Sequence, residues 1–119
     1  MSTDIWPSEI RLDPAKTTLT VAFENGDRFQ LPAEYLRIES PSAEVQGHAA
    51  AQKGTVGGKK NVKITGLEPV GNYAVRILFD DGHDTGLYSW DWLHELGRDR
   101  NKKWAAYLKS LGAQGLTRE

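Results

Sequence analysis

Apolar and polar side chains alternate along two segments of the chain, residues 18–23 and residues 74–79. Alternation with a period of two, in stretches rich in β-branched and aromatic residues, is typical of a strand with one buried face. The apolar positions have the same spacing in both segments, so we expect two equivalent strands. These positions are Leu19, Val21 and Phe23 in the first segment and Val75, Ile77 and Phe79 in the second.

The residues that follow these two strands also correspond. Asn25-Gly26 comes after the first strand and Asp81-Gly82 after the second. Asn-Gly is the pair best able to take positive φ at both centres of a type I′ hairpin turn, so a return strand is expected at residues 28–31. A helix is expected at residues 32–37, where a proline stands at an early position.

The chain therefore contains two copies of a strand–turn–strand–helix unit. The second copy is one residue longer, so that Tyr35-Leu36 in the first helix matches Trp92-Leu93 in the second. Further strands are expected at residues 9–13 and 62–67. Strands joined by turns favour a small antiparallel sheet with helices collected on one face, and the predicted fold class is α+β.

The C-terminal part of the chain is expected to be helical and to pack on one face of the sheet. Ser89 is a suitable N-cap, and Asp91 lies in the positively polarised first turn. Gly97 is a candidate break between two segments, with a C-terminal helix and tail at residues 97–119, and Gly112 is a candidate helix end. The apolar positions that share one face at helical spacing are Leu93, Leu96, Trp104, Leu108 and Leu111.

Composition and length narrow the possible classes of protein. With 119 residues, 39% of them hydrophobic and 26% charged, the chain is expected to form one globular domain over residues 1–119. The formal net charge of −1 gives no overall field that would attract nucleic acid or an anionic membrane. The chain has no cysteine, so it cannot by itself form a disulfide or a thiolate-bound metal site. No segment resembles a signal peptide or a membrane span, and a cytoplasmic location is expected.

His83 is the strongest single candidate for chemistry because Asp81 and Asp84 lie beside it, just past the second turn. Imidazole together with carboxylates suits iron, manganese or zinc. The alternative is a polar hairpin end whose side chains bond to local backbone and water, and we favour it because so short a motif is weak evidence. No phosphate-binding loop and no Gly-x-Ser-x-Gly elbow occurs, so we predict neither a catalytic residue nor a cofactor.

Three groups of side chains are candidates for binding a partner. A dense aromatic cluster forms either core at a strand-to-helix corner or, where exposed, interface anchors. Two basic runs suggest a nucleic-acid surface, although the slightly acidic balance of the chain argues against it. A histidine in the central loop, residues 40–61, is either a switch or ligand or simply solvated; the loop lacks periodicity and is expected to be mobile. The aromatic candidates are Tyr88, Trp90 and Trp92, and the loop histidine is His48. The basic candidates are Lys59 and Lys60 in the first run and Arg98, Arg100, Lys102 and Lys103 in the second.

The second half of the chain resembles a known protein family. Residues 62–93, with Phe79-Asp80-Asp81-Gly82-His83 at their centre, closely resemble the γ-butyrobetaine hydroxylase-like N-terminal domain, also called domain of unknown function 971. Leu36-Arg37 and Ser40-Pro41-Ser42 match its first half, so the resemblance extends over residues 8–96. It implies a small α+β domain that occurs alone in bacteria, at the N-terminus of iron- and 2-oxoglutarate-dependent hydroxylases, and fused to P-loop iron–sulfur carriers.

The resemblance also implies where a metal would lie. In the hydroxylases this domain holds structural zinc through three cysteines and one histidine, and these positions fall on Ser40, Ser42, Val45 and His83. A neutral hydroxyl is a poor zinc ligand and valine offers none, so we expect a degenerate site without zinc. The catalytic domain of the hydroxylases has no counterpart here, and hydroxylation is not implied for this chain.

The leading hypothesis from the sequence is a non-enzymatic interaction module that binds a protein partner through residues 40–60, the aromatic corner, or both. One alternative is a metal-linked accessory protein for iron–sulfur or iron-dependent enzymes, with a weak site at His83 and Asp81 or Asp84. Another is nucleic-acid binding through the lysine-rich loop. The identity of the partner and the oligomeric state are left open.

Overall fold

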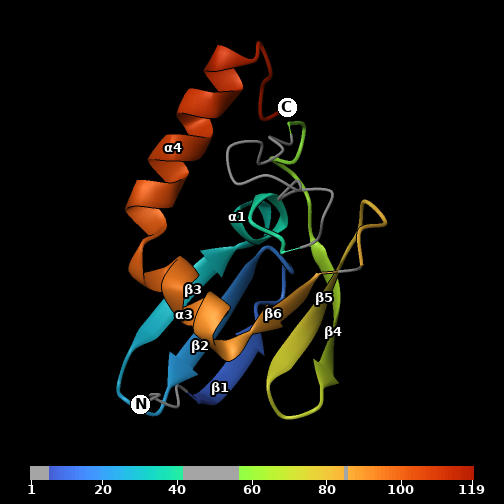
Figure 1. Cartoon of the computed structure of the whole chain (residues 1–119). Helices are drawn as coiled ribbons and strands as arrows, with labels where there is room; N and C mark the ends of the chain where they lie inside the picture. The colour runs from blue at the N-terminus through green and yellow to red at the C-terminus, as the bar shows by residue number, and fades with distance from the viewer. Residues whose placement is uncertain (1–5, 42–56, 85) are drawn as a thin grey trace.

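The computed structural model describes residues 6–41, 57–84 and 86–119. Within these ranges the strands form two three-stranded antiparallel sheets, each followed by a helix (Figure 1). The first unit comprises β1 (Pro7–Leu12), β2 (Thr18–Phe23), β3 (Arg28–Pro32) and α1 (Ala33–Ile38). The second comprises β4 (Ile64–Val70), β5 (Ala74–Phe79), β6 (Leu87–Ser89) and α3 (Trp90–Arg98), and α4 (Arg100–Ala113) follows it.

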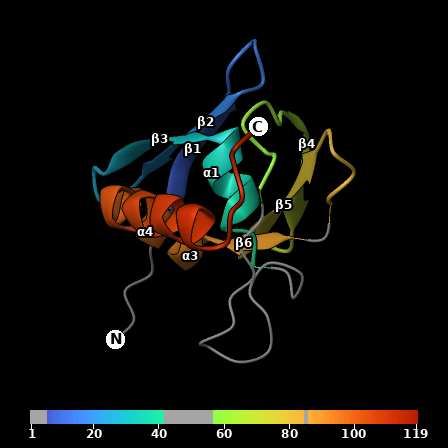
Figure 2. The same ribbon diagram turned by 90° about the horizontal axis from the view of Figure 1, so that it is seen from above.

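The α+β class and the two strand–turn–strand–helix units are confirmed. Each unit also carries a leading strand, β1 or β4, that pairs with the first strand of its hairpin. The strands are divided between two sheets, whereas the sequence predicted a single one. In both views α1 lies between α4 on one side and the second sheet on the other (Figures 1 and 2).

The first hairpin closes with a turn that differs from the predicted one. The Phe23 N–H donates to the Asp27 carbonyl (2.7 Å), and the Gly26 N–H donates to the Phe23 carbonyl (3.0 Å). The Asn25 side-chain oxygen accepts from the Asp27 N–H at 3.0 Å. Gly26 has φ of 99°, but Asn25 does not have positive φ. The predicted type I′ turn is therefore wrong, because the side-chain hydrogen bond of Asn25 holds an Asx turn and glycine alone supplies the left-handed residue.

The second hairpin makes the same three hydrogen bonds at the equivalent positions. The Phe79 N–H donates to the His83 carbonyl (3.0 Å), and the Gly82 N–H donates to the Phe79 carbonyl (3.1 Å). The Asp81 side chain accepts from the His83 N–H at 3.0 Å, and Gly82 has φ of 90°. The duplication seen in the sequence is thus also a duplication of backbone geometry.

Each helix packs on the hairpin of the other unit. Helix α3 crosses β3 at Gly97, where an added Cβ would overlap the ring of Phe29. In the other half Ser40, just past α1, packs on Gly86, where an added Cβ would lie 2.5 Å from the Ser40 Oγ. Gly97 is equivalent to Ser40 and Phe29 to Gly86 in the alignment of the two units. The contacts are therefore reciprocal, as in a two-fold interface, and the units exchange helices.

The core is built from the faces that the alternating patterns predicted. The apolar sides of β2 and β5 meet α1 and α3 in one buried cluster. Burial of this apolar surface is the main favourable contribution to folding. The predicted strand residues that it contains are Leu19, Val21, Phe23, Val75, Ile77 and Phe79.

The second helix begins as predicted but breaks two residues later than expected. The Ser89 Oγ accepts from the Trp92 N–H at 3.2 Å, which confirms the N-cap. The break falls at Asp99 and not at Gly97, which stays inside α3 because its missing side chain lets Phe29 approach.

Two predictions for the C-terminal helix are wrong. Leu108 is 42% exposed, and the neighbouring Tyr107 is buried in its place, so the inward face of α4 passes through Trp104, Tyr107 and Leu111. The helix does not stop at Gly112 but continues to Ala113, and the left-handed residue that follows its end is Gly115, with φ of 68°. The Leu116 N–H then donates back to the Leu111 carbonyl at 2.9 Å, as in a Schellman motif.

The C-terminal tail ties α4 back to the first unit. The N–H groups of Gly58 and Lys60 donate to the carbonyls of Thr117 and Arg118, both at 2.9 Å. The Arg118 guanidinium makes two hydrogen bonds to Glu34 of α1 (2.9 and 2.7 Å). Within the described residues no helix has the length and apolarity that a membrane span requires. Most of the loop predicted to be mobile, residues 40–61, lies outside the described residues.

Candidate functional site

His83 lies where the tip of the second hairpin meets the end of α1. It is only 9% exposed, and its Nε2 shares a hydrogen bond of 2.9 Å with the Ser40 Oγ. These two residues occupy two of the four positions that the family resemblance assigns to zinc ligands, and the structure brings them into contact. Gly86 makes the contact possible, because a side chain there would strike the Ser40 hydroxyl.

Asp81 is the centre of a small charged cluster beside His83. Its Oδ2 accepts from the Arg37 Nε (2.8 Å) and from the Lys59 Nζ (2.6 Å), while its Oδ1 accepts from the His83 N–H. Burial by itself would raise the pKa of this carboxyl. The hydrogen bonds from Lys59, His83 and Arg37 outweigh burial and lower the pKa of Asp81 to about 2. The carboxylate is therefore ionised at neutral pH and fully engaged with cations.

The described residues do not fit a tetrahedral zinc site. Only His83 offers a good ligand, since Ser40 presents a hydroxyl and Asp81 is held by two cations. No group of three or more His, Asp or Glu side chains is placed to hold a metal within residues 6–41, 57–84 and 86–119. Asp84 is exposed. The positions of Ser42, Val45 and His48 lie outside the described residues.

A second histidine, which is partly buried, forms the counterpart of this corner in the other half. His94 of α3 donates from Nε2 to the Asp27 Oδ2 at 2.6 Å, and this hydrogen bond lowers the pKa of Asp27. The rings of Phe23 and Phe29 pack edge-on against the imidazole. Sequence reasoning missed this pair, although Asp27 occupies the position equivalent to His83, and that equivalence was the available signal.

The aromatic corner is mostly structural. Tyr88 was predicted as a partner contact, but it is 0% exposed and its hydroxyl donates to the Leu36 carbonyl, so that prediction is wrong. Burial raises the pKa of the Tyr88 hydroxyl. Trp90 and Trp92 are partly buried, and each indole N–H donates to a main-chain carbonyl, of Asn72 (2.9 Å) and of Glu39 (3.1 Å) respectively. Only the remaining faces of these two indoles are available to a partner.

The two candidate lysines line a hollow of about 500 Å³ near the C-terminal tail. Lys59 is bound to Asp81, and Lys60 pairs with Glu119 at 3.1 Å. The acidic residues that line this hollow are Asp80, Asp81 and Glu119, and the basic ones are Lys59, Lys60 and Arg118. The local charge is therefore balanced, and this does not favour the nucleic-acid hypothesis.

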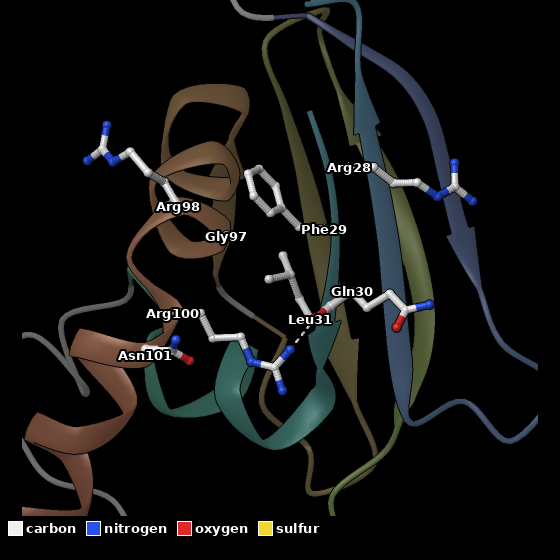
Figure 3. A pocket seen from close by; sticks show the side chains of 8 residues that line it. All are labelled: Arg28, Phe29, Gln30, Leu31, Gly97, Arg98, Arg100 and Asn101. Atoms are coloured by element: carbon white, nitrogen blue, oxygen red, sulfur yellow. Dashed lines mark hydrogen bonds between the residues drawn. The ribbon is translucent and has the colours of Figure 1, made fainter. Parts of the chain in front are cut away.

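A groove of about 450 Å³ runs along the outer edge of β3, and we call it the β3 groove (Figure 3). It is lined by residues 28–31 of β3 and by Gly97, Arg98, Arg100 and Asn101 from the junction of α3 and α4. Figure 3 shows the Phe29 ring turned toward Gly97, and the guanidinium group of Arg100 lying across the groove to the Gln30 carbonyl (2.9 Å).

Sequence reasoning identified only part of this groove. Arg98 and Arg100 belong to the second basic run, but nothing local indicates that Arg28 and Phe29 lie beside them. Arg100 and Gln30 are 70 positions apart in the chain, and the exchange of helices brings them together.

Comparison with known proteins gives consistent results. Residues 10–94 match the family described as gamma-butyrobetaine hydroxylase-like, N-terminal. No curated protein matches the chain. An NMR solution structure is 46% identical to this chain, with a TM-score of 0.83, and the match covers 98% of this chain and 92% of the chain in that structure. A second NMR solution structure is 44% identical to this chain, with a TM-score of 0.85, and the match covers 100% of this chain and 89% of the chain in that structure.

A crystal structure of a protein of unknown function from Acidithiobacillus ferrooxidans ATCC 23270, which belongs to the DUF971 family, is 35% identical. The match covers 76% of this chain and 91% of the chain in that crystal structure, with a TM-score of 0.63. The family model spans most of the chain, and the two NMR relatives match it nearly from end to end. The chain therefore belongs to the γ-butyrobetaine hydroxylase-like N-terminal domain family, domain of unknown function 971.

Proposed function

We propose that this domain is a non-catalytic accessory module that binds a protein partner. The observation that carries the proposal is the chemistry of the β3 groove. Its lining offers guanidinium and amide groups suited to recognising a partner, and none of its eight residues carries a nucleophile or a proton carrier suited to neutral pH. Arginine is one of the residue types that most often dominate binding energy at protein interfaces.

The other polar groups that might take part in chemistry are used to hold the two units together. His83 bonds to Ser40, and His94 bonds to Asp27, in both cases across the boundary between the units. A general base must reach the proton that it removes from a substrate. Each imidazole is instead engaged by a side chain of the other unit, which supports a structural role for both.

Membership of a family named for an N-terminal, hydroxylase-like domain fits an accessory role beside a separate catalytic protein. We propose a cytoplasmic setting on the sequence argument alone. The exposed faces of Trp90, Trp92 and Lys60 stay candidate contacts at the rim of an interface, in addition to the β3 groove.

Affinity capture tests the proposal. The purified domain is immobilised and exposed to an extract of cells that express it, with and without an excess of the free domain as competitor. We expect at least one protein whose recovery falls on competition and whose direct binding is then measured by calorimetry. Recovery that competitor never changes, together with turnover of a substrate by the purified chain, would contradict the proposal.

A metal-linked accessory role is the second candidate, and one observation favours it. Ser40 and His83, at two of the positions assigned to zinc ligands, lie in contact at 2.9 Å. Residues outside the described ranges would have to complete such a site. Metal analysis of the wild-type protein and of His83→Ala separates this candidate from the first.

A further inference from the structure

We propose that an extended, acidic segment of a partner protein binds along the outer edge of β3 and adds a strand to the first sheet. The proposal rests on the proposed function, since it names the surface and the kind of partner segment that the interaction module would use. Three observations carry it: the direction of the β3 main chain, the position of Arg100, and the charge of the groove.

The main chain of β3 presents hydrogen-bonding groups to the groove. At the two ends of the β2–β3 pair, the Asp27 carbonyl accepts from β2 and the Ala33 N–H donates to the Thr17 carbonyl at 2.8 Å. In an antiparallel pair the direction of these groups alternates along the strand. The N–H and C=O groups of Arg28 and Gln30 therefore point away from β2, toward the groove. Unpaired groups on such an edge are a template for another strand.

Arg100 occupies one of the places that a partner main chain would take. One of its guanidinium nitrogens donates to the outward-facing Gln30 carbonyl at 2.9 Å, where the N–H of an added strand would otherwise donate (Figure 3). An arginine side chain on a strand edge is easily displaced, because a long flexible side chain is ordered only at an entropic cost. Once displaced, the same guanidinium would pair with a carboxylate of the incoming segment.

The charge of the groove selects an acidic segment. Arg28, Arg98 and Arg100 line it, and no aspartate or glutamate is among its lining residues. Arg28 pairs with Glu9 (3.5 Å) and Arg98 with Asp99 (2.9 Å), but both arginine side chains are more than half exposed, so a carboxylate of the ligand can compete for them. Side chains of an added strand alternate between the two faces of the sheet. Acidic residues at alternate positions would therefore meet Arg28 on one face, and small apolar residues would lie beside Phe29 on the other.

The outer edge of β4 makes a useful contrast. The Tyr73 N–H donates to the Val70 carbonyl, and the same alternation turns Pro69 away from β5, toward solvent. Proline on an outward position removes a donor and protects an edge against pairing. On the β3 edge the outward-facing proline, Pro32, stands only at the end of the strand, so the outward groups of Arg28 and Gln30 are not blocked by a proline. The Gln30 carbonyl is covered by the movable side chain of Arg100.

The groove suits a peptide better than a nucleic acid. Its guanidinium groups point in different directions in Figure 3, so they do not form the continuous track that a phosphate backbone follows. The Phe29 ring faces Gly97 and cannot stack on a base.

The experiment uses the whole chain and the acetylated peptide EVEVEVE as the probe, with binding followed by two-dimensional NMR of the ¹⁵N-labelled protein. We expect saturable shifts that centre on the amides of Arg28, Gln30 and Gly97. The variant R100E should weaken binding about tenfold or more, since it replaces an attractive contact by a repulsive one. R76A is the matched control, because Arg76 pairs with Glu68 on the other sheet and should leave the affinity unchanged.

Two further probes decide between explanations. EVEPEVE lacks a central N–H and should bind at least about fivefold more weakly if the main chain pairs with β3; equal binding would overturn strand addition. Tighter binding of the oligonucleotide dT8 than of EVEVEVE would overturn the choice of an acidic peptide. Failure of EVEVEVE to bind, combined with partner capture that R100E leaves unchanged, would remove this assignment while the interaction function stands.

Discussion

Tyr35 and Trp92 occupy equivalent positions in the two units, and each donates a hydrogen bond to the end of the other unit's helix. The Tyr35 hydroxyl bonds to the Leu96 carbonyl of α3 at 2.7 Å, and the Trp92 indole bonds to the Glu39 carbonyl at the end of α1 at 3.1 Å. The last carbonyls of a helix have no partner within the helix. The two units therefore complete each other's helix ends, and the polar core depends on both halves folding together.

Removing the Tyr35 hydroxyl tests this reciprocal arrangement. We expect Tyr35→Phe to lower the free energy of unfolding by about 1–2 kcal/mol, because the buried Leu96 carbonyl loses its partner while the ring packing is kept. Tyr73→Phe is the matched control, since Tyr73 is 55% exposed, and should change stability by less than about 0.5 kcal/mol. Urea unfolding followed by circular dichroism measures both, and equal stabilities of the two variants would contradict the role of Tyr35.

Two glycines inside helices should respond to the same substitution with opposite signs. Alanine is favoured over glycine in a helix by about 0.8–1 kcal/mol. At Gly112 nothing lies near an added Cβ, so Gly112→Ala should stabilise the protein by up to about that amount. At Gly97 the new Cβ would overlap the Phe29 ring, and overpacking costs about 1–3 kcal/mol. Gly97→Ala should therefore destabilise, and thermal unfolding that showed both variants to be stabilised would contradict the close packing of α3 on β3.

The two units could be predicted from the sequence because they are encoded locally. A period of two, a turn pair and an N-cap at Ser89 depend on residues a few positions apart, and each appears in the structure. The turn at Asn25-Gly26 was predicted with the wrong geometry because the Asn25 side chain bonds to the Asp27 N–H, a choice that propensity alone does not settle. Leu108 was misplaced because Tyr107 and Leu108 both fall near the face of Trp104 and Leu111 at helical spacing, and spacing alone does not decide which of the two is buried.

The candidate site was less predictable because its contacts join distant parts of the chain. Arg37 and Asp81 are 44 positions apart, and His94 and Asp27 are 67 apart. Both pairs exist only because each helix crosses to the other unit, and no local pattern indicates that exchange. The same applies to the β3 groove, whose two walls come from opposite ends of the domain's sequence.

Acid should weaken the Asp81 cluster. Because the pKa of Asp81 is lowered from 3.8 to about 2, its contribution to stability is complete above pH 5 and is lost as the pH falls toward 2. We expect a contribution of about 1–2 kcal/mol after allowance for solvent screening. In Asp81→Asn this part of the pH dependence should disappear. Unfolding free energies measured at pH 5, 4 and 3 for both proteins test this, and parallel curves would contradict the ion pairs to Arg37 and Lys59.

His83 separates the structural from the metal-linked role. If the hydrogen bond to Ser40 is structural, His83→Ala should lower the free energy of unfolding by about 1–3 kcal/mol, because the buried Ser40 hydroxyl loses this partner, and the metal content should not change. Protein purified without a histidine tag is analysed by elemental mass spectrometry and by thermal unfolding with and without added Zn²⁺. Glu24→Gln is the control, since Glu24 is exposed on the first hairpin, is not a candidate ligand and should change neither quantity. One metal ion per chain in the wild type, lost in His83→Ala, would contradict the structural role and establish the metal-linked alternative.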